Sequence, residues 1–129
     1  MLLGSLEISG SALTAERLRM DLIAQNLANA ETTRTPQGGP YRRHVSVFEV
    51  AENGGVAVGA VVEDPAPFKL KYDPSHPDAG PDGYVRMPNV DVAAEIVDLM
   101  AAARAYEASV AALVTVRGMA LKSLEISSR

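Results

Sequence analysis

The chain has 129 residues, a net charge of −4 and 47% hydrophobic residues, which is enough sequence for one domain. No segment carries the basic excess that binding to nucleic acid or to an anionic membrane would need. The absence of cysteine excludes disulfides and thiolate metal sites.

The N-terminal segment, residues 1–35, is predicted to form a long helix. Apolar residues recur every seven positions at Leu6, Leu13, Met20 and Leu27, and Ile23 fits the companion position of the heptad. The opening, MLLGSLEISGSA, has no basic region before its apolar residues and is interrupted by a glutamate. We therefore expect no cleaved signal peptide.

Polar residues mark the end of this helix. Asn26 and Asn29 are three apart and share one face, and Thr32, Thr33 and Pro36 follow. Asparagine and threonine side chains bond to nearby backbone groups where a helix stops. One interpretation of this motif is thus a local helix end and turn.

The middle segment, residues 36–88, holds all eight prolines and is predicted to be β-rich, with tight connections. Apolar residues alternate over residues 45–48 and 56–62, and the ENGG sequence between them favours a hairpin turn. Residues 68–72 alternate in the same way. The sequence DPSHPDAGPDG, residues 73–83, is predicted to be a loop.

The C-terminal segment, residues 89–129, is predicted to be a helix about 50 Å long that begins with Asp91 as its N-cap and runs to about residue 126. Its apolar stripe follows alternating steps of three and four, as in a coiled-coil seam, and only Arg117 interrupts it. The members of the stripe before that arginine are Ile96, Leu99, Ala103, Tyr106, Val110 and Leu113.

The fold class is therefore α+β: long N- and C-terminal helices pair as a coiled coil and flank a small β-rich, Pro/Gly-rich middle segment. Periodicity does not identify the partner of an apolar stripe, so packing within one chain and packing between chains are both open. No apolar run approaches the length of a membrane span.

Catalysis finds little support in the residues. His44 lies in a predicted strand and His76 in a proline-rich loop, and a solvent-exposed structural role suits both. Asp73, Asp78 and Asp82 lie close together, but their spacing does not match an EF-hand loop. No catalytic constellation, metal site or cofactor site is expected.

Three motifs in order resemble the bacterial flagellar rod, hook and hook-associated protein family. MDLIAQNLANAETTRTPQGGPYRR is similar to the N-terminal signature of that family. YDPSHPDAGPDGYVRMPNVD resembles the loop that leads into the last helix, and DLMAAARAYEASVAAL followed by MALKSLEI resembles that helix. The resemblance covers nearly the whole chain and is strongest to the short, proximal-rod members.

The resemblance implies a structural protein that assembles helically in the flagellar basal body, transmits torque and encloses the export channel. Implied partners are further copies of the chain, other rod proteins, the adaptor at the inner-membrane ring and the flagellar export apparatus. The candidate subunit-interface residues are Leu6, Leu13, Met20, Ile23, Asn26, Leu27, Asn29, Thr32, Thr33, Ile96, Leu99, Ala103, Tyr106, Val110 and Leu113. The alternative is a soluble helical-hairpin binding module with no role in a filament.

Overall fold

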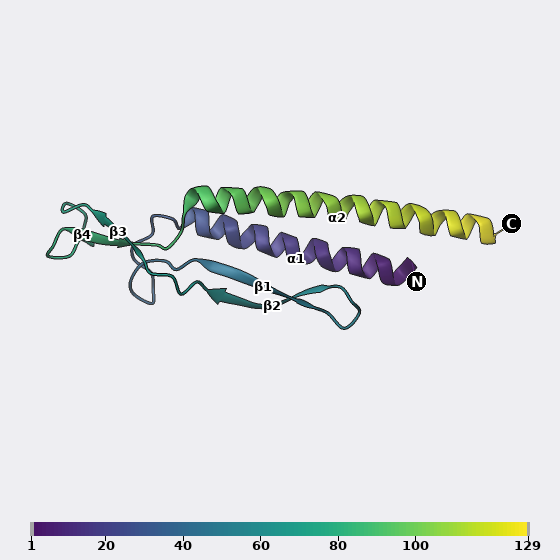
Figure 1. Cartoon of the computed structure of the whole chain (residues 1–129), viewed down its shortest axis with the longest axis horizontal. Helices are drawn as coiled ribbons and strands as arrows, with labels where there is room; N and C mark the ends of the chain where they lie inside the picture. Colours follow the sequence, from purple (N-terminus) through teal and green to yellow (C-terminus); the bar gives the residue numbers. More distant parts are fainter. Residues whose placement is uncertain (1, 129) are drawn as a thin grey trace.

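Two long helices lie side by side in opposite directions, and two small hairpins are attached to them (Figure 1). The computed structural model describes residues 2–128. The elements in chain order are α1 (Leu2–Ala28), β1 (His44–Val50), β2 (Val56–Glu63), β3 (Lys69–Tyr72), β4 (Tyr84–Met87) and α2 (Val92–Ser127). The α+β class and the two terminal helices are thus confirmed.

Helix α1 is the central element. It contacts α2 on one side and both strands of the β1–β2 hairpin on the other (Figure 1). Its buried residues are Ala15, Leu22, Ile23 and Asn26, and α2 contributes the fully buried Ala102. Small residues at this seam allow the two helices to approach closely, but they leave only a thin apolar core.

The face that α2 turns toward α1 is offset from the predicted stripe. Leu99, Tyr106 and Leu113 are half-buried, as the stripe requires. Ile96 and Val110, however, are 46% and 38% exposed, while Glu95 beside Ile96 is 1% exposed. Ile96 and Val110 therefore face away from α1, and their role as contacts to other molecules stays a prediction.

The first hairpin forms as the sequence predicts. β1 and β2 pair antiparallel, with Val45 opposite Val62 and a bulge between Val47 and Phe48. The turn closes with a 2.8 Å bond from the Ala51 amide to the Gly55 carbonyl, and Gly54 has a φ of +84°. At the hairpin tip, the Val56 amide donates to Ser11 Oγ of α1 over 3.1 Å.

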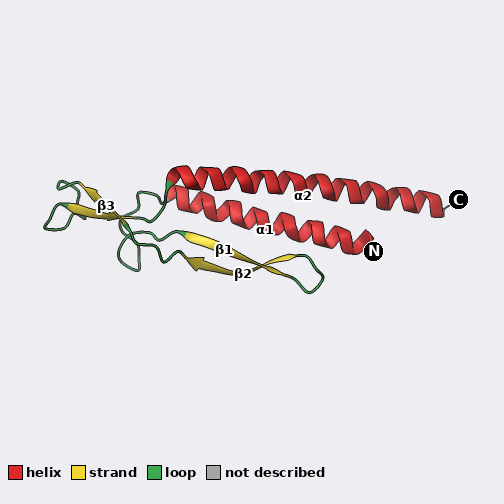
Figure 2. Cartoon of the chain, in the orientation of Figure 1, coloured by secondary structure: helices red, strands yellow, loops and turns green. Residues whose placement is uncertain are grey.

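The second hairpin lies at the end of the molecule opposite the two termini (Figure 2). β3 pairs with β4, which the sequence analysis did not predict, and Tyr72 lies edge-on against Tyr84 with 5.2 Å between ring centroids. β4 has four residues and ends before Pro88, which is too short a run to show alternation. Residues 73–83 connect the two strands, as expected of a loop.

Helix α2 begins as predicted. The Asp91 carboxylate accepts hydrogen bonds from the amides of Ala93 and Ala94, over 3.1 and 3.3 Å. Its 36 residues exceed the 27 of α1, so α2 extends beyond the α1 N-terminus (Figure 1). By length and composition alone α2 could cross a membrane, which corrects the expectation that no apolar run approaches that length.

We predict that Gly55→Ala destabilises the chain, because a Cβ at position 55 would lie 2.5 Å from Ser11 Oγ. Overpacking of this kind costs about 1–3 kcal/mol in the free energy of unfolding, measured by urea denaturation. Gly10→Ala is the control: nothing lies within 4 Å of a Cβ there, and alanine favours the helix by up to about 1 kcal/mol. Equal stability of Gly55→Ala and the wild type would show that the hairpin tip is not held against α1.

Candidate functional site

Polar side chains from several elements meet where α1 ends and α2 begins. We call Asn26, Arg43, Asp64, Asn89 and Glu95 the Arg43 cluster. Asn26 comes from the last turns of α1 and Glu95 from the first turn of α2. Arg43 precedes β1, Asp64 follows β2, and Asn89 lies between β4 and α2. The cluster therefore joins both helices to the middle segment.

Arg43 faces three carboxylates. Its Nε donates to Glu95 Oε1, and its two terminal nitrogens lie 3.1 Å from Asp64 Oδ2 and 3.5 Å from Asp98 Oδ2. Burial acts to lower the pKa of Arg43, but the hydrogen bonds and charges of Glu95 and Asp64 outweigh it and raise that pKa. Removing the arginine would leave Glu95, which is 1% exposed, without its charge partner.

Asn26 uses the full capacity of its amide. Its Nδ2 donates to the His44 carbonyl over 2.9 Å and to Glu95 Oε2 over 3.3 Å. Its Oδ1 accepts from the His44 amide over 3.0 Å and from the Tyr41 hydroxyl over 2.8 Å. Asn26 thus pairs with the backbone of His44 and connects α1 to α2 directly. An aspartate or leucine could not reproduce this pattern.

Asn89 also joins separate segments of the chain through its side-chain amide. Its side-chain oxygen accepts from the Arg43 amide over 2.8 Å, and its Nδ2 donates to the carbonyls of Asp64 and Ala66 over 3.0 and 3.1 Å. Those two carbonyls also accept from the guanidinium of Arg42, which lies 4.2 Å from the ring centroid of Phe68. The chain after β2 is therefore fixed to the chain before β1.

The polar end of the N-terminal motif bonds within its own chain. Asn29 Nδ2 donates to the Gln25 carbonyl over 2.9 Å, and Asn29 Oδ1 accepts from the Thr32 hydroxyl over 3.1 Å. The Thr33 hydroxyl donates to Asp78 over 2.7 Å, and Arg34 also pairs with Asp78. These bonds, first from Thr33 and then from Arg34, lower the pKa of Asp78. The segment after α1 is thereby tied to the loop between β3 and β4.

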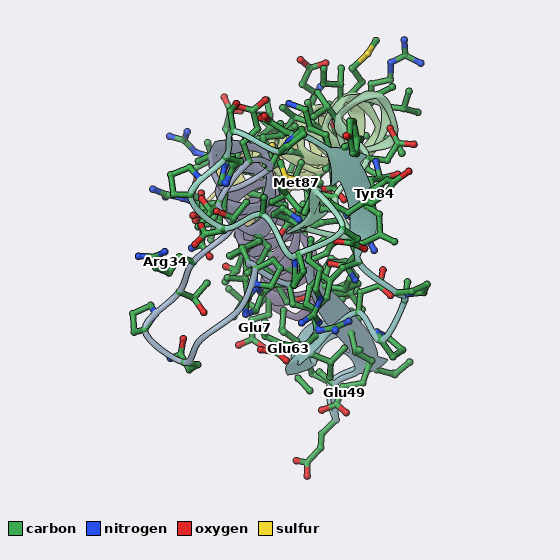
Figure 3. All side chains as sticks on the ribbon, turned by 90° about the vertical axis from the view of Figure 1, so that its left-hand side faces the viewer. Glu7, Arg34, Glu49, Glu63, Tyr84 and Met87 are labelled. Carbon is green, nitrogen blue, oxygen red and sulfur yellow. The ribbon has the colours of Figure 1, made fainter. Side chains whose placement is uncertain are left out.

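Several charged residues lie at the edge of the molecule when it is viewed along its long axis (Figure 3). Figure 3 looks along the molecule from the end that carries β3 and β4, and Arg34 lies at the rim of that view. Glu49 and Glu63 of the first hairpin lie far from Tyr84 and Met87 of β4 in the same view (Figure 3). The labelled charged residues Arg34, Glu49 and Glu63 thus lie away from β4 in this view.

The histidines are less exposed than the sequence analysis expected. His44 is half-buried, its ring nitrogen Nδ1 lies 2.9 Å from the Tyr41 hydroxyl, and its backbone is held by Asn26. His76 Nδ1 accepts from the Asp78 amide over 3.0 Å. Both histidines are thus half-buried rather than solvent-exposed, and each ring bonds to its own chain, as a structural role requires.

The cluster is suited to holding elements together. Within residues 2–128, every buried side-chain nitrogen or oxygen has a hydrogen-bond partner, and no group of three acidic or histidine side chains is placed to hold a metal ion. A fully satisfied polar network in a thin core fixes the relative position of the elements that contribute to it. Its chemistry is therefore that of a structural clamp.

The structure separates the candidate interface residues by exposure. Ile23 and Asn26 are buried, and Ile96 and Val110 are exposed. The others are half-buried: Leu6, Leu13, Met20, Leu27, Asn29, Thr32, Thr33, Leu99, Ala103, Tyr106 and Leu113. Sequence reasoning missed Arg43, Asp64, Asn89 and Glu95, because their polar groups follow no periodic pattern in the sequence.

Comparisons with known proteins identify one family over nearly the whole chain. The family described as "Flagella basal body rod protein" matches residues 6–34, and "Flagellar basal body rod FlgEFG protein C-terminal" matches residues 82–126. The chain is 48% identical to "Flagellar basal-body rod protein FlgC" of Escherichia coli O6:H1, over 97% of both chains. It is 46% identical to the protein of that name from Salmonella typhimurium, over 97% of both chains, and 43% identical to that from Bacillus subtilis, over 95% of both.

We predict an acid-dependent contribution from Asp64. The Ala66 amide and then Arg43 lower the pKa of Asp64 below its ordinary value of 3.8. A carboxylate whose pKa is depressed by folding stabilises the chain above its unfolded pKa, and this is lost as pH falls through the folded pKa. The difference in the free energy of unfolding between wild type and Asp64→Asn should therefore be constant from pH 7 to about 5 and shrink below about pH 4. Urea titrations across this range measure it, and a difference unchanged down to pH 2 would contradict the assignment.

Proposed function

The chain belongs to the family of flagellar basal-body rod protein FlgC, and we propose that it builds the proximal part of the rod by helical self-assembly. It is a structural subunit of the flagellar basal-body rod. In the proposed assembly, residues 1–35 and 89–129 form the helical core, and residues 36–88 lie outside it.

The exposed apolar surface of α2 carries this proposal. Large apolar side chains are exposed along the whole helix, at Val92, Ile96, Val97, Met100, Val110, Val114, Met119, Leu121, Leu124 and Ile126. Large exposed apolar surfaces on soluble proteins mark contact sites. Helices of neighbouring subunits would remove this surface from water.

The half-buried residues of α1 and α2 have a second role in this proposal. Leu6, Leu13, Met20, Leu99, Tyr106 and Leu113 pack partly within the chain and keep some surface for a neighbour. Asn29 and Thr32 already bond to their own helix end, which favours the local interpretation of that motif. A contact of Asn29 across a subunit boundary remains a prediction.

The remaining parts of the proposal follow from the family. The subunit would pair with copies of itself, with other rod proteins and with the adaptor at the inner-membrane ring. It would leave the cell through the flagellar export apparatus without a cleaved signal peptide, enclose the export channel and transmit torque. It would have no enzymatic activity. The Arg43 cluster supports the torque-bearing role, because it fixes the middle segment to both helices.

The alternative of a helical-hairpin binding module is not favoured. A binding module would share the helix pair, but the relatives are rod proteins and match over nearly the full length of both chains. A short module would also need to bury the apolar surface of α2 within itself, whereas this chain leaves it exposed.

We predict that Ile96→Asp abolishes motility and leaves the monomer folded. Ile96 is 46% exposed, so a carboxylate there remains hydrated and changes the free energy of unfolding by no more than about 1 kcal/mol. In an assembled rod the same carboxylate would be buried without a partner. Motility of a strain that carries only this variant, beside urea denaturation of the purified chain, tests both parts.

Ile96→Leu is the matched control and should keep motility. Leu113→Asp should differ from Ile96→Asp by destabilising the monomer as well, since Leu113 is half-buried. Wild-type motility with Ile96→Asp would remove this part of α2 from the subunit interface.

A further inference from the structure

Helix α2 carries two overlapping apolar stripes, and only one of them faces α1. The inward stripe contains Glu95, Leu99, Ala102, Tyr106 and Leu113, all buried or half-buried. The outward stripe is exposed and contains Val92, Ile96, Val110, Val114 and Leu121. Because successive residues of an α-helix lie about 100° apart, rotation of α2 by about half a residue position would turn Ile96, Ala103 and Val110 toward α1 and keep Leu99, Tyr106 and Leu113 there.

Apolar burial alone favours the other rotation. It would turn Ile96 and Val110 toward α1 and turn Glu95 and Ser109 away from it. Isoleucine and valine gain more from leaving water than glutamate and serine do. The rotation in the structure therefore requires an interaction that recognises Glu95 specifically.

We propose that the Arg43 cluster sets the rotation of α2 about its own axis and thereby keeps the outward stripe available. Glu95 accepts a hydrogen bond from Arg43 at one carboxylate oxygen and from Asn26 at the other, so its position is fixed from two directions. Asp98, on the next turn of the same side, adds a third contact with Arg43. The other rotation would carry both carboxylates away from the guanidinium.

The rest of the helix pair supplies little opposition to rotation. Its most buried members are Ala15, Leu22, Ile23 and Ala102, which are apolar and include two alanines. Contacts of this type tolerate several rotations of the same helix, whereas a buried polar group accepts only the one that satisfies it. The cluster thus selects one arrangement among several that apolar packing allows.

The test reads the rotation with single thiols, which is possible because the chain has no cysteine. Ala102→Cys reports the inward face, since Ala102 is 0% exposed, and Val110→Cys reports the outward face. Both probes lie two to four turns beyond Glu95, so local damage at the cluster does not reach them. Each is introduced into the full-length wild type and into Arg43→Met/Glu95→Met, and the rate of alkylation by a maleimide is measured.

In the wild-type background, the thiol at 110 should react at least tenfold faster than the thiol at 102. In Arg43→Met/Glu95→Met this order should reverse, because position 110 turns inward and position 102 turns outward. Rates that stay unchanged would overturn the proposal. So would acceleration of both thiols, since the cluster would then hold the helices together without choosing their rotation.

Two further variants complete the test. Glu95→Gln keeps the size of Glu95 and one acceptor oxygen, which can still accept from Arg43, and should retain the wild-type order of rates. If the double variant loses its helical circular dichroism, Glu95→Met alone is used instead, because Arg43 then keeps Asp64 and Asp98 as partners. A reversed order of alkylation rates in that variant supports the proposal, and the wild-type order overturns it. The availability of the outward stripe for neighbours rests on the proposed rod function, but the thiol rates do not. Reversed rates with intact motility would therefore overturn the interface on α2 and leave the role of the cluster standing.

Discussion

The structure depends on one guanidinium group held among three carboxylates. Arg43 lies where α1, α2 and the middle segment meet, and it compensates the charge of Glu95, which is 1% exposed. A buried ion pair is costly to form, because both charges leave water, and it is costly to break, because one charge is then left alone. Its main effect is therefore on geometry: the elements around it can come together in only one way.

That constraint matters because the apolar core is thin. The buried hydrophobic residues of the described chain are Ala15, Leu22, Ile23, Val85, Val90 and Ala102, and three of them lie on α1. Helix α1 holds this core together by packing against α2 on one side and the first hairpin on the other. Asn26 of α1 bonds to His44 at the start of β1, and Ser11 of α1 bonds to the hairpin tip, so polar contacts complete the attachment that apolar burial begins.

Much of this fold follows from the sequence, because its signals are local. The Asp91 cap, the turn before Gly55 and the two long helices each depend on residues that are close together in the chain. The Arg43 cluster joins residues separated by up to 69 positions, and no local sequence pattern predicts such a contact. The predicted stripe of α2 included Ile96 and Val110 because they are the more apolar choice, and their exposure follows from a polar contact that periodicity does not detect.

The competition between a polar contact at Glu95 and apolar burial of Ile96 and Val110 explains why a polar contact suits a subunit that assembles. An apolar surface that is available to a neighbouring subunit can also be buried within its own chain. These two ways of burying it compete, and a more apolar interface between α1 and α2 would strengthen the competition. An interaction that requires Glu95 on the inward face opposes burial of the outward stripe within the chain, and it adds no apolar surface of its own. Leaving Ile96 and Val110 in water forgoes apolar burial that a neighbouring subunit can supply. A cluster that holds α2 in the rotation with less internal apolar burial therefore makes assembly more favourable.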